Sequence, residues 1–182
     1  CAEVVCVGLG AENDWRARDL QLDPTGCSFA VEAPNSDFAG EYRVNLLGRN
    51  QATNALLAIA IGAQLGVSPG TVKRGLAACR PAPMRMEASV ISGVTVINDA
   101  YNANADSIAA ALETLAEIEC FGRRVAVFGD MAELGSQSEN AHAEAGARAA
   151  NAGVDALYLV GKFASATAGA ALSATAAGRT AW

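Results

Sequence analysis

The sequence lacks an excess of positive charge. Its 13 lysines and arginines are outnumbered by 19 aspartates and glutamates, and the formal net charge is −6. Nucleic-acid-binding proteins usually carry a basic patch, and none is visible along this chain. We therefore expect no nucleic acid among its partners, and the acidic balance favours a location in the cytoplasm.

Long hydrophobic runs and targeting signals are also missing. The apolar stretch from Ala55 to Leu65 is too short to span a bilayer. The start, Cys1-Ala2-Glu3, has no basic region that could begin a signal peptide. We therefore expect no membrane partner. Because the chain does not start with Met and both ends interrupt patterned segments, we expect it to be cut from a longer chain.

The cysteine and glycine patterns exclude several kinds of site. The five cysteines are an odd number without a C-x-x-C pair, which argues against a disulfide framework or a zinc site. Gly8 and Gly10 could open a dinucleotide fingerprint, but Asn13 stands where its third glycine belongs, so we interpret them as a turn. No G-x-x-x-x-G-K-[ST] loop is present, because Gly161-Lys162 is followed by Phe163. The chain alone is therefore not expected to hydrolyse ATP.

Hydrophobic residues, at 52%, are plentiful enough to build a core. The segment from residue 1 to 47 is β-rich. From Asn50 the apolar spacing becomes helical, with Leu56, Ile59 and Leu65 assigned to one face together with Ala55 and Ala58. A second helix is expected to begin with Ser68 as N-cap and Pro69 at its first position, followed by a Val72, Leu76 and Cys79 stripe. Pro81 and Pro83 then favour an extended linker, where we place a domain boundary.

Beyond the linker, strands alternate with helices. The expected elements are strands at 87–91, 94–98, 125–128 and 156–160, and helices at 107–119, 138–151 and from 162 onward. The first two strands enclose a Ser92-Gly93 turn, and the strand at 125–128 is expected to be buried. Alternation of this kind predicts βαβ units and a parallel sheet, so the fold class is α/β. We divide the chain into domains at 1–80 and 84–182.

Polar segments follow the ends of the strands predicted to be parallel. One is Asp99–Asn104, and the other is Gly129–Gly135. Ligands of open parallel sheets bind outside the carboxyl ends of the strands, so these loops predict a functional rim. An alternative is that Asn104, Asp106 and Ser138 simply cap helices.

Four segments of the sequence resemble the motifs of one ligase family. The segment Asp99–Ser107, D-A-Y-N-A-N-A-D-S, resembles D-S-Y-N-A-N-P-x-S. The segment Gly129–Gly135, G-D-M-A-E-L-G with His142 further on, is similar to G-D-M-x-E-L-G…H. Arg85–Glu87 resembles R-x-E/F, and Gly48–Leu56 resembles G-R-H-N-x-x-N-A-L. The four occur in the order found in the tripeptide–D-alanyl-D-alanine ligase family (MurF) of the Mur ligases, which the chain resembles, and the resemblance covers essentially the whole chain.

This resemblance implies the end of a central ATPase domain followed by an incomplete Rossmann-like C-terminal domain. It implies an ATP- and Mg²⁺-dependent ligase of cell-wall synthesis that joins D-alanyl-D-alanine to UDP-N-acetylmuramoyl-tripeptide through an acyl phosphate. The metal ligands would lie largely outside this chain. Asn50 and Gln51 depart from the family's His and Asn, and Ala100 and Ala105 from its Ser and Pro.

By the same resemblance, the site residues take three roles. Arg85 would face the phosphates of ATP or the acyl phosphate and act in catalysis. Gln51 and Asn54 would lie near the adenine, and Asp99 near the ribose. The pocket for D-alanyl-D-alanine would be shaped by Tyr101, Asn102, Asn104, Asp130 and Glu133.

Simpler roles remain open for several of these residues. Arg85 could form a linker salt bridge, Asn54 a buried cap, and His142 a solvated or capping group. Lys162 could be a surface lysine. Two other functions also stay open: another Mur-fold ligase such as folylpolyglutamate synthase, and a non-catalytic fragment that binds nucleotide. Because the first domain lacks sheet partners, we further expect self-association.

Overall fold

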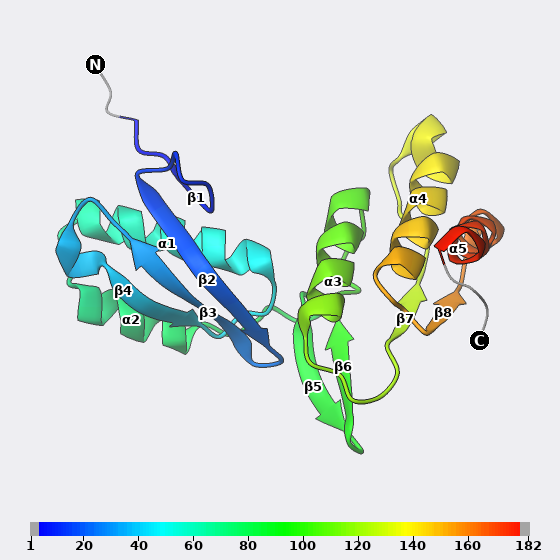
Figure 1. Ribbon diagram of the computed structural model, residues 1–182, viewed down its shortest axis with the longest axis horizontal. Helices are drawn as coiled ribbons and strands as arrows, with labels where there is room; N and C mark the ends of the chain where they lie inside the picture. The colour runs from blue at the N-terminus through cyan, green and yellow to red at the C-terminus, as the bar shows by residue number, and fades with distance from the viewer. Residues whose placement is uncertain (1–3, 179–182) are drawn as a thin grey trace. The chain divides into compact units, whose positions relative to one another are not determined.

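The computed structural model describes residues 4–178, and the chain divides into two compact units, the first ending at Asn98 and the second beginning at Asp99 (Figure 1). The predicted division into domains at 1–80 and 84–182 stays a prediction. No helix of the described segment is long and apolar enough to cross a membrane.

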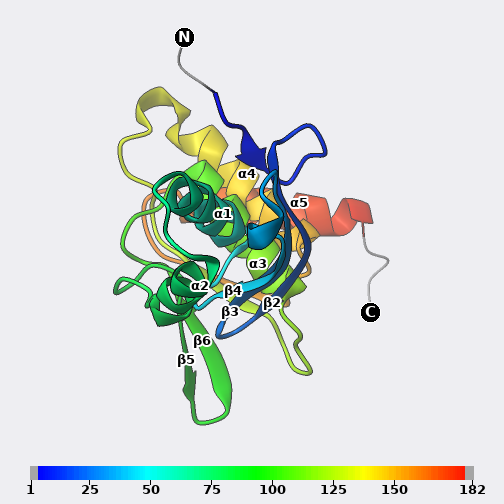
Figure 2. The same ribbon diagram turned by 90° about the vertical axis from the view of Figure 1, so that its left-hand side faces the viewer.

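The first unit contains a four-stranded sheet in the order β1-β2-β3-β4, which α1 and α2 contact (Figure 2). The strands are β1 (Val7–Gly8), β2 (Trp15–Asp23), β3 (Gly26–Glu32) and β4 (Gly40–Val44). Only β1 and β2 pair in parallel. A short 3₁₀ turn, η1 (Ser36–Phe38), precedes β4. This sheet confirms that the first segment is β-rich.

The strand β2 was not predicted as an individual strand. Its first residues alternate between buried Trp15 and Ala17 and the charged Arg16 and Arg18. The alternation then stops at Asp19, whose φ of 54° accompanies a register shift against β3. This bulge conceals the period of two that identifies a half-buried strand.

Helices α1 (Arg49–Gln64) and α2 (Pro69–Ala78) agree with the prediction, including the Ser68 side chain accepting from the Thr71 N–H. The face assigned to α1 needs correction, because Leu65 is 75% exposed and Ala58 is exposed, whereas Leu56 and Ile59 are fully buried. At about 100° per residue, Leu65 lies half a turn away from Leu56. Leu57 and Ile61 of α1, together with its C-cap residue Leu65, therefore form an exposed stripe.

The core of the first unit lies between this sheet and α1. Phe29, Leu56, Ile59, Val44 and Cys27 are its largest fully buried hydrophobic side chains. Its proline linker is followed by the hairpin of β5 (Glu87–Ile91) and β6 (Val94–Asn98). The turn residues Ser92 and Gly93 both have positive φ, at 50° and 82°, as a two-residue type I′ turn requires.

The second unit contains α3 (Ala105–Glu117), β7 (Val125–Phe128), the 3₁₀ turn η2 (Gly135–Gln137), α4 (Ser138–Asn151), β8 (Ala156–Leu159) and α5 (Ala164–Gly178). Strands β7 and β8 pair in parallel across α4, so the α/β prediction is confirmed. The strand at 94–98, which was also predicted to be parallel, is β6, and it pairs instead with β5 in antiparallel orientation.

The prediction that β7 is buried is wrong. Its Ala126 is buried, but Val125 and Val127 are 46% and 69% exposed. Side chains alternate between the two faces of a strand, and only the face carrying Ala126 is buried here. Val127 and its partner Tyr158 therefore lie on an exposed apolar face of the β7–β8 pair.

Candidate functional site

Gln51 and Asn54 lie one turn apart near the start of α1. The Asn54 Nδ2 donates to Gln51 Oε1 at 3.3 Å, and the Gln51 N–H donates to the Gly48 carbonyl at 3.0 Å. Gly48, which supplies that carbonyl, has a φ of 117°, a backbone conformation that glycine adopts readily. The predicted adenine-reading amides are thus brought together, with Asn54 exposed and Gln51 half-buried.

Arg85 is exposed and sits in a sharp bend between two residues with left-handed backbone. The φ angles of Met84 and Met86 are 58° and 49°, a backbone conformation that residues other than Gly, Asn and Asp rarely adopt. The bend is tied by the Arg85 N–H donating to the Ala82 carbonyl at 3.1 Å, and by the Met84 N–H donating to Glu87 Oε2 at 3.2 Å. Strained backbone of this kind is concentrated at functional sites in proteins.

In the loop that precedes α3, Tyr101 is 59% exposed, Asn102 is exposed and Asp99 is half-buried. Asn104 acts as the N-cap of α3: its Oδ1 accepts from the Ser107 N–H at 2.8 Å, while Ser107 Oγ accepts from the Asn104 N–H at 2.9 Å. The capping alternative is therefore confirmed for Asn104.

The other two capping candidates, Ser138 and Asp106, do not act as N-caps in the way that Asn104 does. Ser138 is the first residue of α4, and its Oγ donates to the Gly135 carbonyl at 2.9 Å instead of accepting from a helix N–H. Asp106 lies in the first turn of α3, where a carboxylate interacts favourably with the helix dipole.

Asp130 connects the loop after β7 to the start of α5. Its two carboxylate oxygens accept from the backbone N–H groups of Lys162 and Phe163, at 2.8 and 3.2 Å. These hydrogen bonds stabilise the ionised form and lower the pKa of Asp130. Gly161 permits the approach, since a Cβ there would lie 2.3 Å from Asp130 Oδ1. The carboxylate is therefore occupied by backbone donors, which the sequence did not indicate.

Glu133 follows in the same loop. It is exposed and has a φ of 62°. Of the two acidic residues predicted for the pocket, Asp130 is the one whose carboxylate accepts from the backbone N–H groups that precede α5.

His142 is buried, at 3% exposure, which contradicts the solvated alternative. Its Nε2 lies 2.8 Å from the Met131 N and its Nδ1 lies 2.6 Å from the Ser138 O. No local sequence pattern could have shown this burial, because it depends on contact with Phe163, 21 residues further along the chain. Lys162 is exposed, as its surface alternative proposed, with Nζ 5.1 Å from the centre of the Phe163 ring.

These residues fall into separate groups. Gln51, Asn54 and Arg85 belong to the first unit, whereas the two rim loops belong to the second. Within the second unit, hydrogen bonds join Asp130 and His142 through the loop after β7 and reach the start of α5. That Tyr101, Asn102 and Asn104 join them in one pocket stays a prediction.

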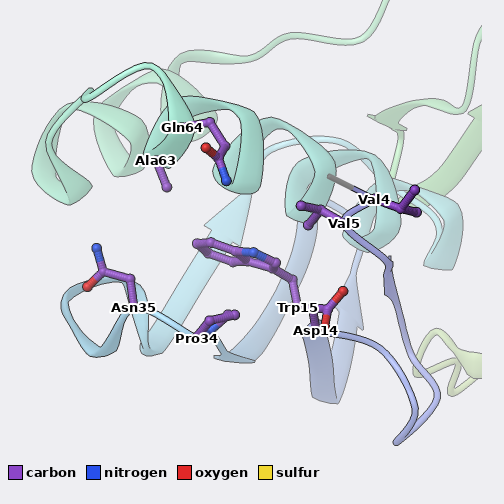
Figure 3. Close-up of a pocket in the computed structure, with 8 residues that line it drawn as sticks. All are labelled: Val4, Val5, Asp14, Trp15, Pro34, Asn35, Ala63 and Gln64. Carbon is purple, nitrogen blue, oxygen red and sulfur yellow. The ribbon is translucent and has the colours of Figure 1, made fainter. Parts of the chain in front are cut away.

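A pocket of about 350 Å³ lies in the first unit between β2 and α1, lined by Trp15, Gln64 and neighbouring residues (Figure 3). None of the predicted site residues lines it. Two of its polar side chains already accept backbone hydrogen bonds: Asp14 from the Cys6 N–H and Asn35 from the Asp37 N–H. The pocket therefore offers few polar groups that could bind a ligand. Within residues 4–178, no group of three His, Cys, Asp or Glu residues could hold a metal ion.

A parallel strand pair whose following loops carry polar residues and join helix starts defines an α/β protein of the kind that binds ligands at strand ends. The family comparison makes this class specific. Residues 84–181, just over half of the chain, match the family model described as Mur ligase, glutamate ligase domain. The chain belongs to the Mur ligase family.

Within this family the chain is similar to UDP-N-acetylmuramoyl-tripeptide–D-alanyl-D-alanine ligases. It is 34% identical to that of Bacillus subtilis over 85% of the chain and 33% of the relative. It is 35% identical to that of Escherichia coli over 84% of the chain and 33% of the relative. The chain therefore spans about a third of the length of these relatives.

Solved structures agree with the sequence comparison. A crystal structure of MurF from Acinetobacter baumannii superposes with a TM-score of 0.80 and 31% identity, covering 90% of this chain and 35% of that one. Mycobacterium tuberculosis folylpolyglutamate synthase superposes with a TM-score of 0.63 and 24% identity, covering 89% of this chain and 37% of that one. The second likeness shows the shared fold alone.

Proposed function

We propose that this chain is part of the ATP-dependent ligase that joins D-alanyl-D-alanine to UDP-N-acetylmuramoyl-tripeptide in peptidoglycan synthesis. The observation that carries the proposal is the 34% identity to a ligase of this name over 85% of the chain. The A. baumannii MurF structure supports it with a closer superposition than the folylpolyglutamate synthase gives.

The proposed reaction has two steps. The terminal carboxylate of the tripeptide attacks the γ-phosphate of ATP, releasing ADP and forming an acyl phosphate. The amine of D-alanyl-D-alanine then attacks the acyl carbon and expels phosphate. No side chain needs to form a covalent bond, so catalysis depends on positioning the substrates and neutralising charge.

The site residues keep the roles proposed for them. The exposed guanidinium of Arg85 would grip phosphate oxygens, and the paired amides of Gln51 and Asn54 would read the adenine edge. Asp99 would lie near the ribose. The pocket for D-alanyl-D-alanine would be built from Tyr101, Asn102, Asn104, Asp130 and Glu133. We expect Glu133 to meet the dipeptide amine and Asp130 to hold the loop, because the Asp130 carboxylate accepts from two backbone amides.

ATP is the proposed co-substrate and Mg²⁺ the metal. The similar structures include a Thermotoga maritima MurF and the M. tuberculosis folylpolyglutamate synthase, both described in complex with ADP. The described residues offer no cluster of three metal-ligating side chains, so Mg²⁺ would be held chiefly by phosphate oxygens and by groups elsewhere in the ligase. A reaction that consumes ATP also supports the proposed cytoplasmic location.

A chimera tests this function. Residues 84–178 would replace the matching segment of the E. coli relative, and phosphate release would be measured with ATP and one of two substrate pairs: UDP-N-acetylmuramoyl-tripeptide with D-alanyl-D-alanine, or a folate substrate with glutamate. We expect turnover with D-alanyl-D-alanine. Turnover only with glutamate and a folate substrate would favour the folylpolyglutamate alternative, and a folded chimera inactive in every mixture would contradict the ligase proposal. The chain alone should release no phosphate, since it lacks the phosphate loop.

We further propose that the chain by itself self-associates. The supporting feature is the exposed face of the β7–β8 pair, formed by Val125, Val127, Tyr158 and Val160. Parallel strands are usually covered on both faces, and a second copy offers the same apolar face in return.

A further inference from the structure

His142 is the single histidine of the sequence, and its ring is hydrogen-bonded at both nitrogens and stacked on another ring. It lies in the second turn of α4 and is 3% exposed. Its ring stacks on that of Phe163, with centroids 4.5 Å apart and planes inclined by 30°. Phe163 belongs to the segment that leads into α5, so the imidazole joins α4 to the start of the next helix.

The two hydrogen bonds of the ring define its protonation. The partner of Nε2 is the backbone N–H of Met131 at 2.8 Å, which can only donate, so Nε2 must carry a lone pair. The partner of Nδ1 is the backbone carbonyl of Ser138 at 2.6 Å, which can only accept, so Nδ1 must carry the proton. The geometry therefore requires a neutral imidazole protonated at Nδ1.

These contacts fix the loop after β7 at its centre. The Met131 side chain is itself 3% exposed, so the loop backbone is anchored both by its side chain and by its N–H. The neighbouring Asp130 accepts from the Lys162 and Phe163 N–H groups, beside the Phe163 ring on which His142 stacks. The Asp130 Oδ1 lies 3.8 Å from His142 Nε2, beyond direct hydrogen-bond distance. His142 and Asp130 thus tie the same loop to two different helices.

Glu133 lies two residues beyond this anchor. Its backbone is left-handed, with a φ of 62°, and its side chain is exposed. A non-glycine residue keeps such a conformation only where the surrounding structure imposes it. The bonds at Met131 and Asp130 on one side, and the Ser138 Oγ bond to the Gly135 carbonyl on the other, supply that restraint.

We propose that His142 is a positioning residue: its imidazole holds the 129–135 loop so that Glu133 is presented to the amine substrate. The presentation to an amine rests on the proposed ligase function, whereas the hold on the loop does not. His142 itself is buried behind the loop and touches no substrate in this assignment.

The first test measures the imidazole directly. In the uniformly ¹⁵N-labelled chain, a long-range ¹H–¹⁵N spectrum contains the signals of one histidine side chain. We expect a protonated Nδ1 and an unprotonated Nε2 at neutral pH. A ring protonated at Nε2, or one averaging between both forms, would overturn the proposal without any variant being made.

The second test uses two variants of similar polarity. The side-chain amide of His142→Gln reaches the position of Nε2 and can accept from the Met131 N–H. The shorter amide of His142→Asn reaches the position of Nδ1 and can serve only the Ser138 carbonyl. We expect the Met131 amide to exchange with solvent about tenfold faster or more in His142→Asn and close to the native rate in His142→Gln. Equal exchange rates in both variants would overturn the proposal.

The third test measures the kinetics with the amine substrate. In the chimera, His142→Asn should raise the KM for D-alanyl-D-alanine about tenfold and change kcat less than threefold, and His142→Gln should restore the KM. A fall in kcat alone with unchanged KM would overturn the presentation of Glu133. If the chimera with native His142 has no activity, the ligase function fails, and the spectrum and exchange rates still decide whether His142 holds the loop.

Discussion

Gly146 lies in the interior of α4, where alanine is ordinarily preferred to glycine by about 0.5–1 kcal/mol. Here the preference is reversed by a close approach of α5. A Cβ on Gly146 would stand 2.1 Å from the Thr167 carbonyl oxygen and 2.9 Å from its carbon. Because the obstacle is backbone rather than the end of a side chain, the two helices would have to separate.

We therefore predict that Gly146→Ala lowers the free energy of unfolding by about 2 kcal/mol or more, since overpacking exceeds the gain in helix propensity. Gly169→Ala is the matched control in α5, because no atom lies within 4 Å of its added Cβ, and it should raise stability by about 0.5–1 kcal/mol. Urea denaturation of both variants decides the matter, and equal shifts would show that α4 and α5 do not approach so closely.

Arg85 is the second residue whose replacement is informative. A guanidinium forms two parallel charged hydrogen bonds to phosphate oxygens, which lysine cannot reproduce. Loss of one such bond costs about 1.5–3 kcal/mol, so kcat of the chimera should fall roughly ten- to a hundredfold in Arg85→Lys and further in Arg85→Ala. Steady-state kinetics and thermal melting are measured together. Unchanged kcat with a lowered melting temperature would instead indicate a linker salt bridge.

At the scale of secondary-structure elements, the C-terminus of α3 is capped by the side chain of Arg124, which follows the helix in the sequence. The Arg124 guanidinium donates to the carbonyls of Leu115, Ala116 and Ile118, at 3.0, 3.3 and 3.0 Å. The last carbonyls of a helix lack partners within it, and a cation there also interacts favourably with the helix dipole. Arg124 immediately precedes β7, so one residue joins helix and strand.

Replacing Arg124 by Met should therefore cost about 2 kcal/mol of unfolding free energy. Arg148→Met is the control, because Arg148 pairs with Glu144 on the exposed surface of α4, where a pair is worth about 0.3–0.5 kcal/mol. Chemical denaturation should separate the two variants clearly, and similar losses would mean that the cap contributes little.

The β2–β3 turn provides an element that responds to pH. The Arg43 guanidinium donates two hydrogen bonds to Asp23, both at 2.9 Å, and holds the pKa of that carboxyl well below its ordinary value of 3.8. A lowered folded-state pKa contributes stability above the unfolded value and loses it as the pH falls below that value.

Asp23→Asn should accordingly destabilise the chain by about 1 kcal/mol near neutral pH, a figure reduced because the Asp23 side chain is 48% exposed. The difference from the native chain should shrink as the pH falls below 3.8 and approach zero only in strong acid, below the lowered pKa of Asp23 in the folded chain. Stability curves of both proteins against pH provide the measurement, and a difference independent of pH would contradict the ion pair.

Local patterns predicted most elements because their causes are local. The Ser68 cap, the Asn104 cap and the Ser92-Gly93 turn each depend on residues at most three positions apart. The phase of α1 was misjudged because alanine and leucine occur on both of its faces, and exposure of Leu65 depends on what the sheet covers. The bulge at Asp19 likewise depends on pairing with β3.

For the whole molecule, the exposed face of the β7–β8 pair predicts the oligomeric behaviour. We expect the average mass from sedimentation to rise with concentration, because apolar area is buried when copies meet. Val127→Lys should keep the chain monomeric. Leu172→Lys, which removes an exposed leucine from α5 instead, should leave the association unchanged. A compact native monomer at high concentration would rule out this role for the face.

At this scale the sequence indicates which segments carry the candidate site residues but not which contacts each side chain makes. The motif around Asp130 marks a loop after a strand, yet its carboxylate partners are the amides of residues 162 and 163, which no local pattern reveals. The burial of His142 is hidden for the same reason, since it depends on the return of the chain to Phe163. The family, the fold class and the β5–β6 hairpin could be predicted from the sequence, whereas the long-range hydrogen bonds could not.

The pairing of β7 with β8 has a consequence for synthesis of the chain on the ribosome. Val125 pairs with Ala156, so β7 must await the whole of α4 before its partner strand exists. At about 5–20 residues per second, that interval lasts on the order of seconds, far longer than the microseconds in which a hairpin such as β5–β6 can close. During each round of translation, the hairpin can therefore be complete while β7 still offers an unpaired edge to chaperones or to neighbouring nascent chains.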